Sequence, residues 1–251
     1  MKLLFGLIFV TLFLFNLSVA WSEPPVPSWI KLLRTSDSDV AADLTTDSMG
    51  NLYVAGRTKG NLNGEINGGN WDAFIVRYDL SGELQWTKLL STSDVDVATA
   101  LTTDSMGNLY VAGVTKGNLN GETNNGNRDA FIVKYDLAGA RLWTKLLGTI
   151  GNDSANALIA DSLGNLYVAG RTDGDLNGEK NNGYPDAFIV KYDSTGVLQW
   201  TKLLGSSRVD MANALTIDGS DNVYVAGSTN GDLNGKINSS LTDSDAFIVK
   251  Y

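Results

Sequence analysis

Four tryptophans, each at the head of a similar five-residue string, recur along this chain at a constant interval of 57 residues. The strings read WIKLL, WTKLL, WTKLL and WTKLL, and they begin at Trp29, Trp86, Trp143 and Trp200. Each is followed by a polar loop, an alanine-rich stretch ending in aspartate, a YVAG segment, a long Gly/Asn-rich loop and a DAFIV segment. Such self-similarity indicates an array of equivalent structural units.

Each unit contains four short segments of strand character. They are rich in Val, Ile, Leu, Tyr, Phe and Thr, and clusters of Gly, Asn, Asp and Ser separate them. After the N-terminal apolar run no segment keeps a 3.6-residue apolar period, so we expect no helix there. Four antiparallel strands in a repeat of about 40–50 residues are typical of a propeller blade. The sequence therefore predicts an all-β fold, a beta-propeller of four four-stranded blades over residues 29–251.

The order of the segments predicts how the ring closes. The alanine-rich strand has the smallest side chains and suits the crowded position nearest the axis, which leaves the Trp-headed strand outermost. The last DAFIV segment has no Trp-headed strand after it, whereas residues 29–33 supply one before the first alanine-rich strand. We therefore expect residues 29–33 to serve as the outer strand of the last blade and to close the ring. The proline-rich residues 21–28 suit an extended lead-in.

The pattern D-x-A, D-x-x-G-N-x-Y-V-A-G-x-T, D-A-F-x-x-K-Y and W resembles the bacterial SBBP-type beta-propeller repeat, with a strand order similar to the NHL repeat. The resemblance covers residues 29–251 four times over, and it implies an exported or surface protein. The family name implies seven blades, whereas four units occur here. Arg34 and Ser91 stand where later units have Gly148 and Gly205. The family carries no catalytic motif to transfer.

Composition excludes several classes of function. The chain has no cysteine and no histidine, so disulfides, thiolate chemistry and a Ser-His-Asp triad are excluded. A net charge of −9 argues against nucleic acid as a partner, because binding phosphate requires a basic surface. Residues 1–20 combine Lys2, an apolar run and the small residues Ser18-Val19-Ala20, which predicts a signal peptide cleaved before Trp21. An uncleaved anchor is the alternative. With the signal removed we expect no membrane span and a secreted, periplasmic or cell-surface protein.

The long loop of the third unit reads DGDLNGEKN, which resembles the start of a calcium-binding loop. In that interpretation the ligands are Asp173, Asp175, Asn177 and Asn181. The first two units read KGNLNGEIN and KGNLNGETN, where a lysine takes the first ligand position and would repel a cation. The alternative is a turn shared by all four units, with the leucine tucked beneath it and Asn-Gly taking positive φ. We expect no cofactor other than Ca²⁺, which remains an open alternative.

The units differ most just before each DAFIV segment. The residue pairs there are Asn70-Trp71, Asn127-Arg128, Tyr184-Pro185 and Asp243-Ser244. Because the scaffold does not dictate these side chains, the loop rim is where we expect a ligand. Trp71, Arg128 and Tyr184 suit stacking on a glycan or contact with a protein. Variation without function in an exposed loop is the alternative.

These features favour an exported, non-enzymatic scaffold that binds or assembles through its loops, as a monomer or homodimer. Two alternatives stay open: a calcium-assisted glycan-binding or adhesive surface module, and a polysaccharide hydrolase or lyase that uses acidic residues. The aspartates that recur at both ends of the alanine-rich strand would supply those carboxylates. Turn capping explains the same aspartates in every unit alike, so no residue is assigned a catalytic role.

Overall fold

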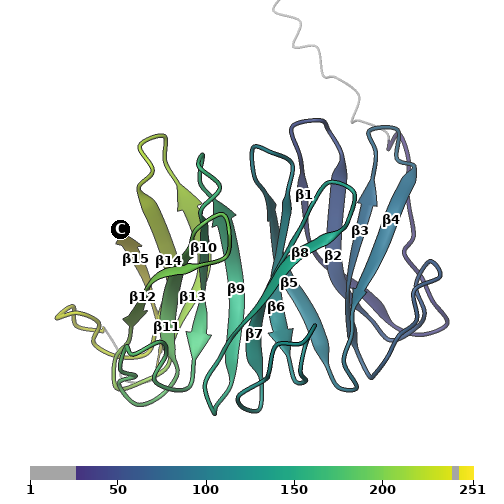
Figure 1. Cartoon of the computed structure of the whole chain (residues 1–251). Coiled ribbons are helices and arrows are strands. Elements are labelled where there is room, and N and C mark those ends of the chain that lie inside the picture. Colours follow the sequence, from purple (N-terminus) through teal and green to yellow (C-terminus); the bar gives the residue numbers. More distant parts are fainter. Residues whose placement is uncertain (1–26, 239–242) are drawn as a thin grey trace, which may run out of the picture. The chain divides into compact units, whose positions relative to one another are not determined.

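The computed structural model of the chain describes residues 27–238 and 243–251 (Figure 1). The predicted signal peptide, residues 1–20, and most of the lead-in lie outside the described residues. Within the described residues the regular structure consists of fifteen β-strands arranged in four antiparallel sheets. This part of the chain contains no helix long and apolar enough to cross a membrane. Residues 32–251 form one compact unit.

Consecutive strands pair with their neighbours in sequence, so each sheet is a simple meander. The first sheet contains β1 (Asp39–Thr46), β2 (Leu52–Thr58), β3 (Asp72–Tyr78) and β4 (Leu84–Leu90). The second contains β5 (Asp96–Thr103), β6 (Leu109–Thr115), β7 (Asp129–Tyr135) and β8 (Arg141–Leu147). The third contains β9 (Asp153–Ala160), β10 (Leu166–Thr172), β11 (Asp186–Tyr192) and β12 (Leu198–Leu204). The fourth contains β13 (Asp210–Ile217), β14 (Val223–Thr229) and β15 (Asp245–Lys250). The prediction of four blade-like sheets is confirmed.

Each hairpin between the first two strands of a sheet is fixed by an aspartate and a residue with positive φ. In the first sheet, Oδ1 of Asp47 accepts the backbone N–H groups of Met49 and Asn51 at 2.9 and 3.0 Å. Gly50 takes a φ of 82°, which costs glycine little because it has no Cβ. The same bonds form around Asp104, Asp161 and Asp218. The predicted capping role of these aspartates is therefore confirmed.

The sheets pack on one another in sequence order through the faces of their first three strands. The first strands of consecutive sheets contact one another, β1 with β5, β5 with β9 and β9 with β13. Small side chains make this approach possible, since Ala98, Ala155 and Ala212 are fully buried there. A bulge interrupts the pairing of all four first strands just after the alanine, for example between Ala98 and Ala100. The predicted position of the alanine-rich strands is confirmed.

The tryptophan of each outer strand connects two sheets. Trp86 in β4 lies 6.0 Å from the ring of Tyr53 in its own sheet and 6.3 Å from the ring of Tyr135 in the next. Its indole N–H donates to the carbonyl of Leu137, which lies in the hairpin of that next sheet. Trp200 in β12 has the same two contacts, with Tyr167 and Tyr251, both at 6.0 Å. The outer strands therefore contribute to the junctions between sheets as well as to their own edges.

The fourth sheet differs from the others because it has three strands. Residues 29–33, which we expected to supply its outer strand, are not in a strand in this structure, and β15 pairs with β14 alone among the described strands. The first and last sheets also do not pack on each other in the way that consecutive sheets do. The structure thus shows four blade-like sheets without the expected closure by the N-terminal strand.

Candidate functional site at the loop rim

The long loops between the second and third strands lie at one edge of their sheets, together with the connections from sheet to sheet (Figure 1). Each loop is built on the same turn. In the third sheet, Asn177 and Gly178 take φ values of 50° and 87°, and Leu176 is buried beneath them. The Asn177 side-chain amide donates to Oγ1 of Thr201 in the outer strand at 2.8 Å. The equivalent asparagines and leucines of the other loops have the same conformation and burial, so the turn interpretation accounts for all four copies.

The candidate calcium ligands of the third loop take part in the hydrogen bonds of this turn. Asp175 forms an ion pair with Lys180 and accepts the backbone N–H of Asn181 at 2.9 Å. Oδ2 of Asp173 instead accepts the side-chain amide of Asn152, in the neighbouring sheet connection, at 2.9 Å. No group of three or more acidic side chains suited to a metal ion occurs in the described part of the chain. Calcium binding therefore stays a prediction, and binding would have to displace these bonds.

Beneath the rim, each junction between sheets buries two aspartates from neighbouring sheets. At the third junction these are Asp186, at the start of β11, and Asp210, at the start of β13, and both are fully buried. Burial first, and then the charge of Asp210, raises the pKa of Asp186 to about 6. Asp72 with Asp96 and Asp129 with Asp153 form the equivalent pairs, and burial raises the pKa of each of those four carboxyls as well. The pairs recur unchanged, so they belong to the scaffold.

The glycines noted in the sequence make room for these carboxyls. A Cβ added to Gly205 would lie 1.9 Å from Cγ of Asp186, and one added to Gly148 would lie 2.2 Å from Cγ of Asp129. The first junction tolerates Ser91 in this position, because its hydroxyl hydrogen-bonds to the carboxylate of Asp72 and accepts the N–H of Gly68 at 3.0 Å. The departure from glycine at Ser91 is thus compensated by hydrogen bonds.

The three predicted rim residues lie at three successive junctions and do not form one common site. Trp71 precedes β3 at the first junction, where its ring is covered by the guanidinium of Arg57 at 4.5 Å and the ammonium of Lys59 at 4.8 Å. Arg128 is exposed at the second junction and forms a parallel bridge with Asn152. These two positions are therefore fixed by local contacts, although the Arg128 side chain remains accessible.

Tyr184 lies at the third junction, where its side chain is 64% exposed and lines a cleft of about 490 Å³. The opposite wall comes from Ser207, Arg208 and Val209, which connect β12 to β13, and Asn230 completes the lining. Arg208 donates its backbone N–H to Oγ of Ser206, and its guanidinium forms no ion pair within the described part of the chain. An aromatic face and an unpaired guanidinium thus border one open cleft.

Arg208 and Asn230 were not identified from the sequence. Arg208 occupies the position of Asp37, Asp94 and Gly151 in the other units, so the same comparison of repeats that selected Tyr184 would have found it. At the second junction the equivalent space is filled by a chain of hydrogen bonds, in which the amide of Asn127 donates to Asn152 at 2.8 Å. The third junction lacks that chain because Tyr184 and Val209 replace the two asparagines, while Arg208 replaces the neighbouring glycine.

Comparison with known proteins agrees with the architecture. Regulatory protein FlaEY of Caulobacter vibrioides is 30% identical over 209 residues, which make up 77% of this chain and 22% of that protein. An uncharacterized WD repeat-containing protein, L264, of Acanthamoeba polyphaga mimivirus is 26% identical over 198 residues, 63% of this chain and 14% of that protein. The chain therefore spans less than a quarter of the length of these curated relatives.

The family model of the beta-propeller repeat SBBP matches this chain four times, over residues 29–63, 85–120, 142–177 and 199–234. Each match starts at or one residue before a Trp-headed outer segment and ends in the turn of the next long loop. The repeat of the family therefore runs from the outer position of one sheet into the next. The chain belongs to the SBBP beta-propeller repeat family.

Proposed function

We propose that this chain is an exported, non-enzymatic scaffold that binds a partner at its loop rim. The observation that carries the proposal is the contrast between invariant and variable positions on one loop. The turn around Asn177 and the buried pair of Asp186 and Asp210 recur in the other units, whereas Tyr184 and Arg208 do not. A rigid loop that presents changing side chains is the usual construction of a binding surface.

The cleft at the third junction favours an acidic glycan as the partner. The exposed ring of Tyr184 offers an apolar face to a sugar, and the guanidinium of Arg208 offers donors in the planar geometry that a carboxylate accepts. The cleft of about 490 Å³ falls in the size range of small-ligand sites. A protein partner is the second candidate, supported by the regulatory name of the relative from Caulobacter vibrioides.

Closure of the ring belongs to the same proposal. The outer position of the fourth sheet is open, and residues 29–33 repeat the sequence of the strands that fill it elsewhere, so we assign that segment to that position. Calcium assistance is the weaker form of the glycan hypothesis, because the oxygens of Asp173 and Asp175 already accept hydrogen bonds.

The test is an array of acidic and neutral oligosaccharides, probed with the exported chain and with the variants Tyr184→Ala and Arg208→Ala. We expect binding to uronic-acid glycans that falls at least tenfold in each variant, with no change when a chelator is added. Arg128→Ala, at the equivalent rim of the preceding junction, is the matched control. If neither glycan class binds, or if Arg128→Ala is as damaging as Arg208→Ala, the proposed cleft is wrong.

A further inference from the structure

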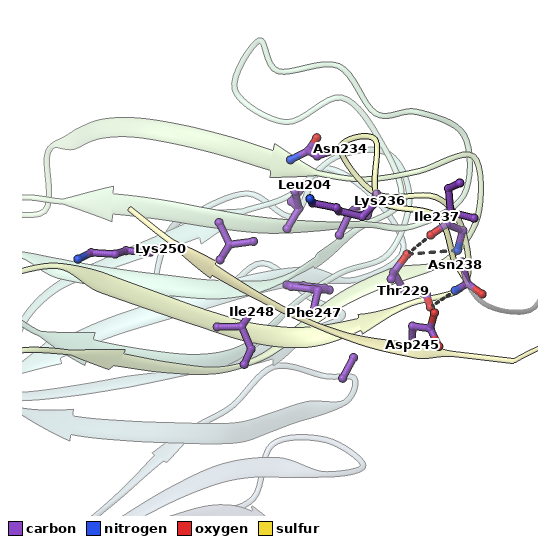
Figure 2. Close-up of a pocket in the computed structure, with 14 residues that line it drawn as sticks. Leu204, Thr229, Asn234, Lys236, Ile237, Asn238, Asp245, Phe247, Ile248 and Lys250 are labelled. Atoms are coloured by element: carbon purple, nitrogen blue, oxygen red, sulfur yellow. Dashed lines mark hydrogen bonds between the residues drawn. The ribbon is translucent and has the colours of Figure 1, made fainter.

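The open edge of the fourth sheet forms a groove. The groove has a volume of about 540 Å³ and runs along β15, with Thr229, Asn234 and Asn238 on the loop side (Figure 2). Ile248 in β15 is 78% exposed, whereas Ile75, Ile132 and Ile189 at the same position of the other sheets are buried. An exposed apolar edge strand is a ready template for another strand.

The other three sheets show what occupies the equivalent position. Their outer strands pair in one register, in which Val76 is opposite Thr87, Val133 opposite Thr144 and Val190 opposite Thr201. The string WIKLL at residues 29–33 matches those strands at four of five positions. Transfer of the register places Leu33 opposite Ala246, Lys31 opposite Ile248 and Ile30 opposite Val249.

The same segment is anchored on the first sheet at its C-terminal end. Leu33 packs against the cluster that contains Leu62 and Phe74 of the first sheet. Two residues later the backbone N–H of Thr35 donates to Oδ2 of Asp39 at 2.6 Å. The equivalent connections between sheets form the same bond at 2.6 Å, at Thr92, Thr149 and Ser206. Residues 33–39 therefore have the same conformation as the connections that follow the outer strands of the other sheets.

The first and fourth sheets each expose apolar residues whose counterparts are buried at the junctions between consecutive sheets. At the second junction Ile132 of one sheet shares a buried cluster with Ala155 and Leu158 of the next. The equivalent of Ile132 at the open edge is the exposed Ile248, and the equivalents of Ala155 and Leu158 on the first sheet are Ala41 and Leu44. Leu44 is 64% exposed, so each end of the chain presents one half of an apolar junction.

A side-chain hydrogen bond between consecutive sheets also has an unused donor among the described residues of the fourth sheet. The hydroxyl of Thr99 and the amide of Asn156, each at the bulge of a first strand, donate to the carbonyls of Ala155 and Ala212 in the next sheet, at 2.7 and 2.9 Å. The next side chain in this series is Asn213, which is exposed and has no side-chain hydrogen bond within the described residues. The carbonyl that continues the series is that of Ala41.

We infer that residues 29–33 of one copy of this chain add as the outer strand to β15 of a second copy, and the reverse, so that two chains close one ring. Self-closure requires the first and last sheets of one chain to pack together, and in the structure they do not pack as consecutive sheets do. The described residues of two copies give eight sheets, within the usual range of propellers, through two identical head-to-tail junctions.

One position of the added strand departs from its counterparts. Ile30 replaces the threonine whose hydroxyl accepts the amide of the loop asparagine in the other sheets, so Asn234 has no hydroxyl acceptor there. The pairing of the backbone and the burial of Ile248 against Leu44 remain available. This inference rests on the assignment of residues 29–33 to the open outer position, and it does not depend on glycan binding.

The absence of cysteine makes a direct test available. In the variant with Ile30→Cys and Val249→Cys, the two sulfurs would face each other across paired strands, at a Cα separation that a disulfide spans. We expect mild oxidation to give a covalent dimer as the main product on a non-reducing gel. The matched control, Ile30→Cys with Ala246→Cys, places the second thiol three residues out of register and should stay monomeric.

Mixing separates the two kinds of closure. When the single variants Ile30→Cys and Val249→Cys are mixed in reduced form and then oxidised, junctions between copies give a heterodimer containing one chain of each kind. An internally cross-linked monomer from the double variant would overturn the inference in favour of self-closure, and a ladder of longer oligomers would overturn the two-copy ring. Sedimentation of the unmodified chain is independent of the variants, and a monomer at micromolar concentration would also overturn the inference.

Discussion

The junction between the second and third sheets and the two ends of the chain are built from the same sequence elements in different surroundings. At that junction Ile132 and Ala155 are fully buried. In the fourth and first sheets their equivalents, Ile248 and Ala41, are exposed, although they lie in the same DAFIV and alanine-rich segments. The local sequence therefore specifies each sheet, whereas burial of the junction requires a neighbour of matching shape.

The largest expected effect comes from removing one side chain from a complete junction. Ile132→Ala should lower the free energy of unfolding by about 2–4 kcal/mol, because it leaves a cavity in a packed interface. Ile248→Ala, the matched change at the open end, should alter the unfolding of the separated chain by less than about 0.5 kcal/mol. Urea denaturation at low protein concentration measures both. Equal losses in the two variants would show that the end junction is already buried within one chain.

The buried aspartates predict a dependence of stability on pH. Because the pKa of Asp186 is raised from 3.8 to about 6, its protonated form is favoured in the folded state. Its stabilising contribution is present below pH 3.8 and is lost as the pH rises through about 6, with a size of about 1–3 kcal/mol. Asp186→Asn should flatten the decline of melting temperature between pH 4 and 7. If Asp186→Asn shows the same decline of melting temperature as the unmodified chain, the decline is caused by other groups.

An aspartate in a surface hairpin should show the opposite dependence of stability on pH. Asp193 accepts the hydroxyl and backbone N–H of Thr195 and the N–H of Val197, and these bonds lower its pKa. Its contribution is present above the unfolded pKa and is lost as the pH falls below it. Asp193→Asn should therefore lower the free energy of unfolding at neutral pH. It should also reduce the difference in this free energy between neutral and strongly acidic pH. The two variants together predict maximum stability at mildly acidic pH, which thermal melts across pH 2–8 can check.

A smaller effect is expected from the polar side chains at a complete junction and at the open end of the chain. Asn156→Ala removes the bond to the carbonyl of Ala212 and should cost about 1 kcal/mol of unfolding free energy. Asn213→Ala should leave the isolated chain unchanged and weaken association of two copies by about thirtyfold, because a ring with two junctions loses one bond of about 1 kcal/mol at each. Dilution series followed by sedimentation measure the second effect. Loss of stability without loss of association in Asn213→Ala would place its partner within the same chain.

The smallest expected effect concerns calcium. Titration of the chain with Ca²⁺ should give no binding heat, since the carboxylates of Asp173 and Asp175 accept hydrogen bonds within the loop and its surroundings. Asp175→Ala then serves as the control for heat from nonspecific binding. Heat that disappears in Asp175→Ala would instead establish the calcium loop.

Much of the fold could be predicted from the sequence because the signals are local and repeated. The glycine and asparagine at Asn177-Gly178 require positive φ, and the small Ala155 requires a crowded strand, so the turns and the innermost strands were identifiable. Closure was not, because it depends on the angle between sheets, which no residue type encodes. Only half of the rim cleft was predicted. Tyr184 lies in the long loop, where the units were compared position by position, whereas Arg208 lies in the connection to the next sheet, where they were not compared.

The sequence repeat and the structural sheet are out of phase, since each family match begins in the outer strand of one sheet and continues into the next. Unequal recombination between two such units would add or delete 57 residues and would still leave every outer segment directly ahead of the first strand of the following sheet. Genes of this type can therefore change length in whole steps while each junction between sheets keeps the same sequence. Selection can then act on the number of sheets without redesigning a single interface.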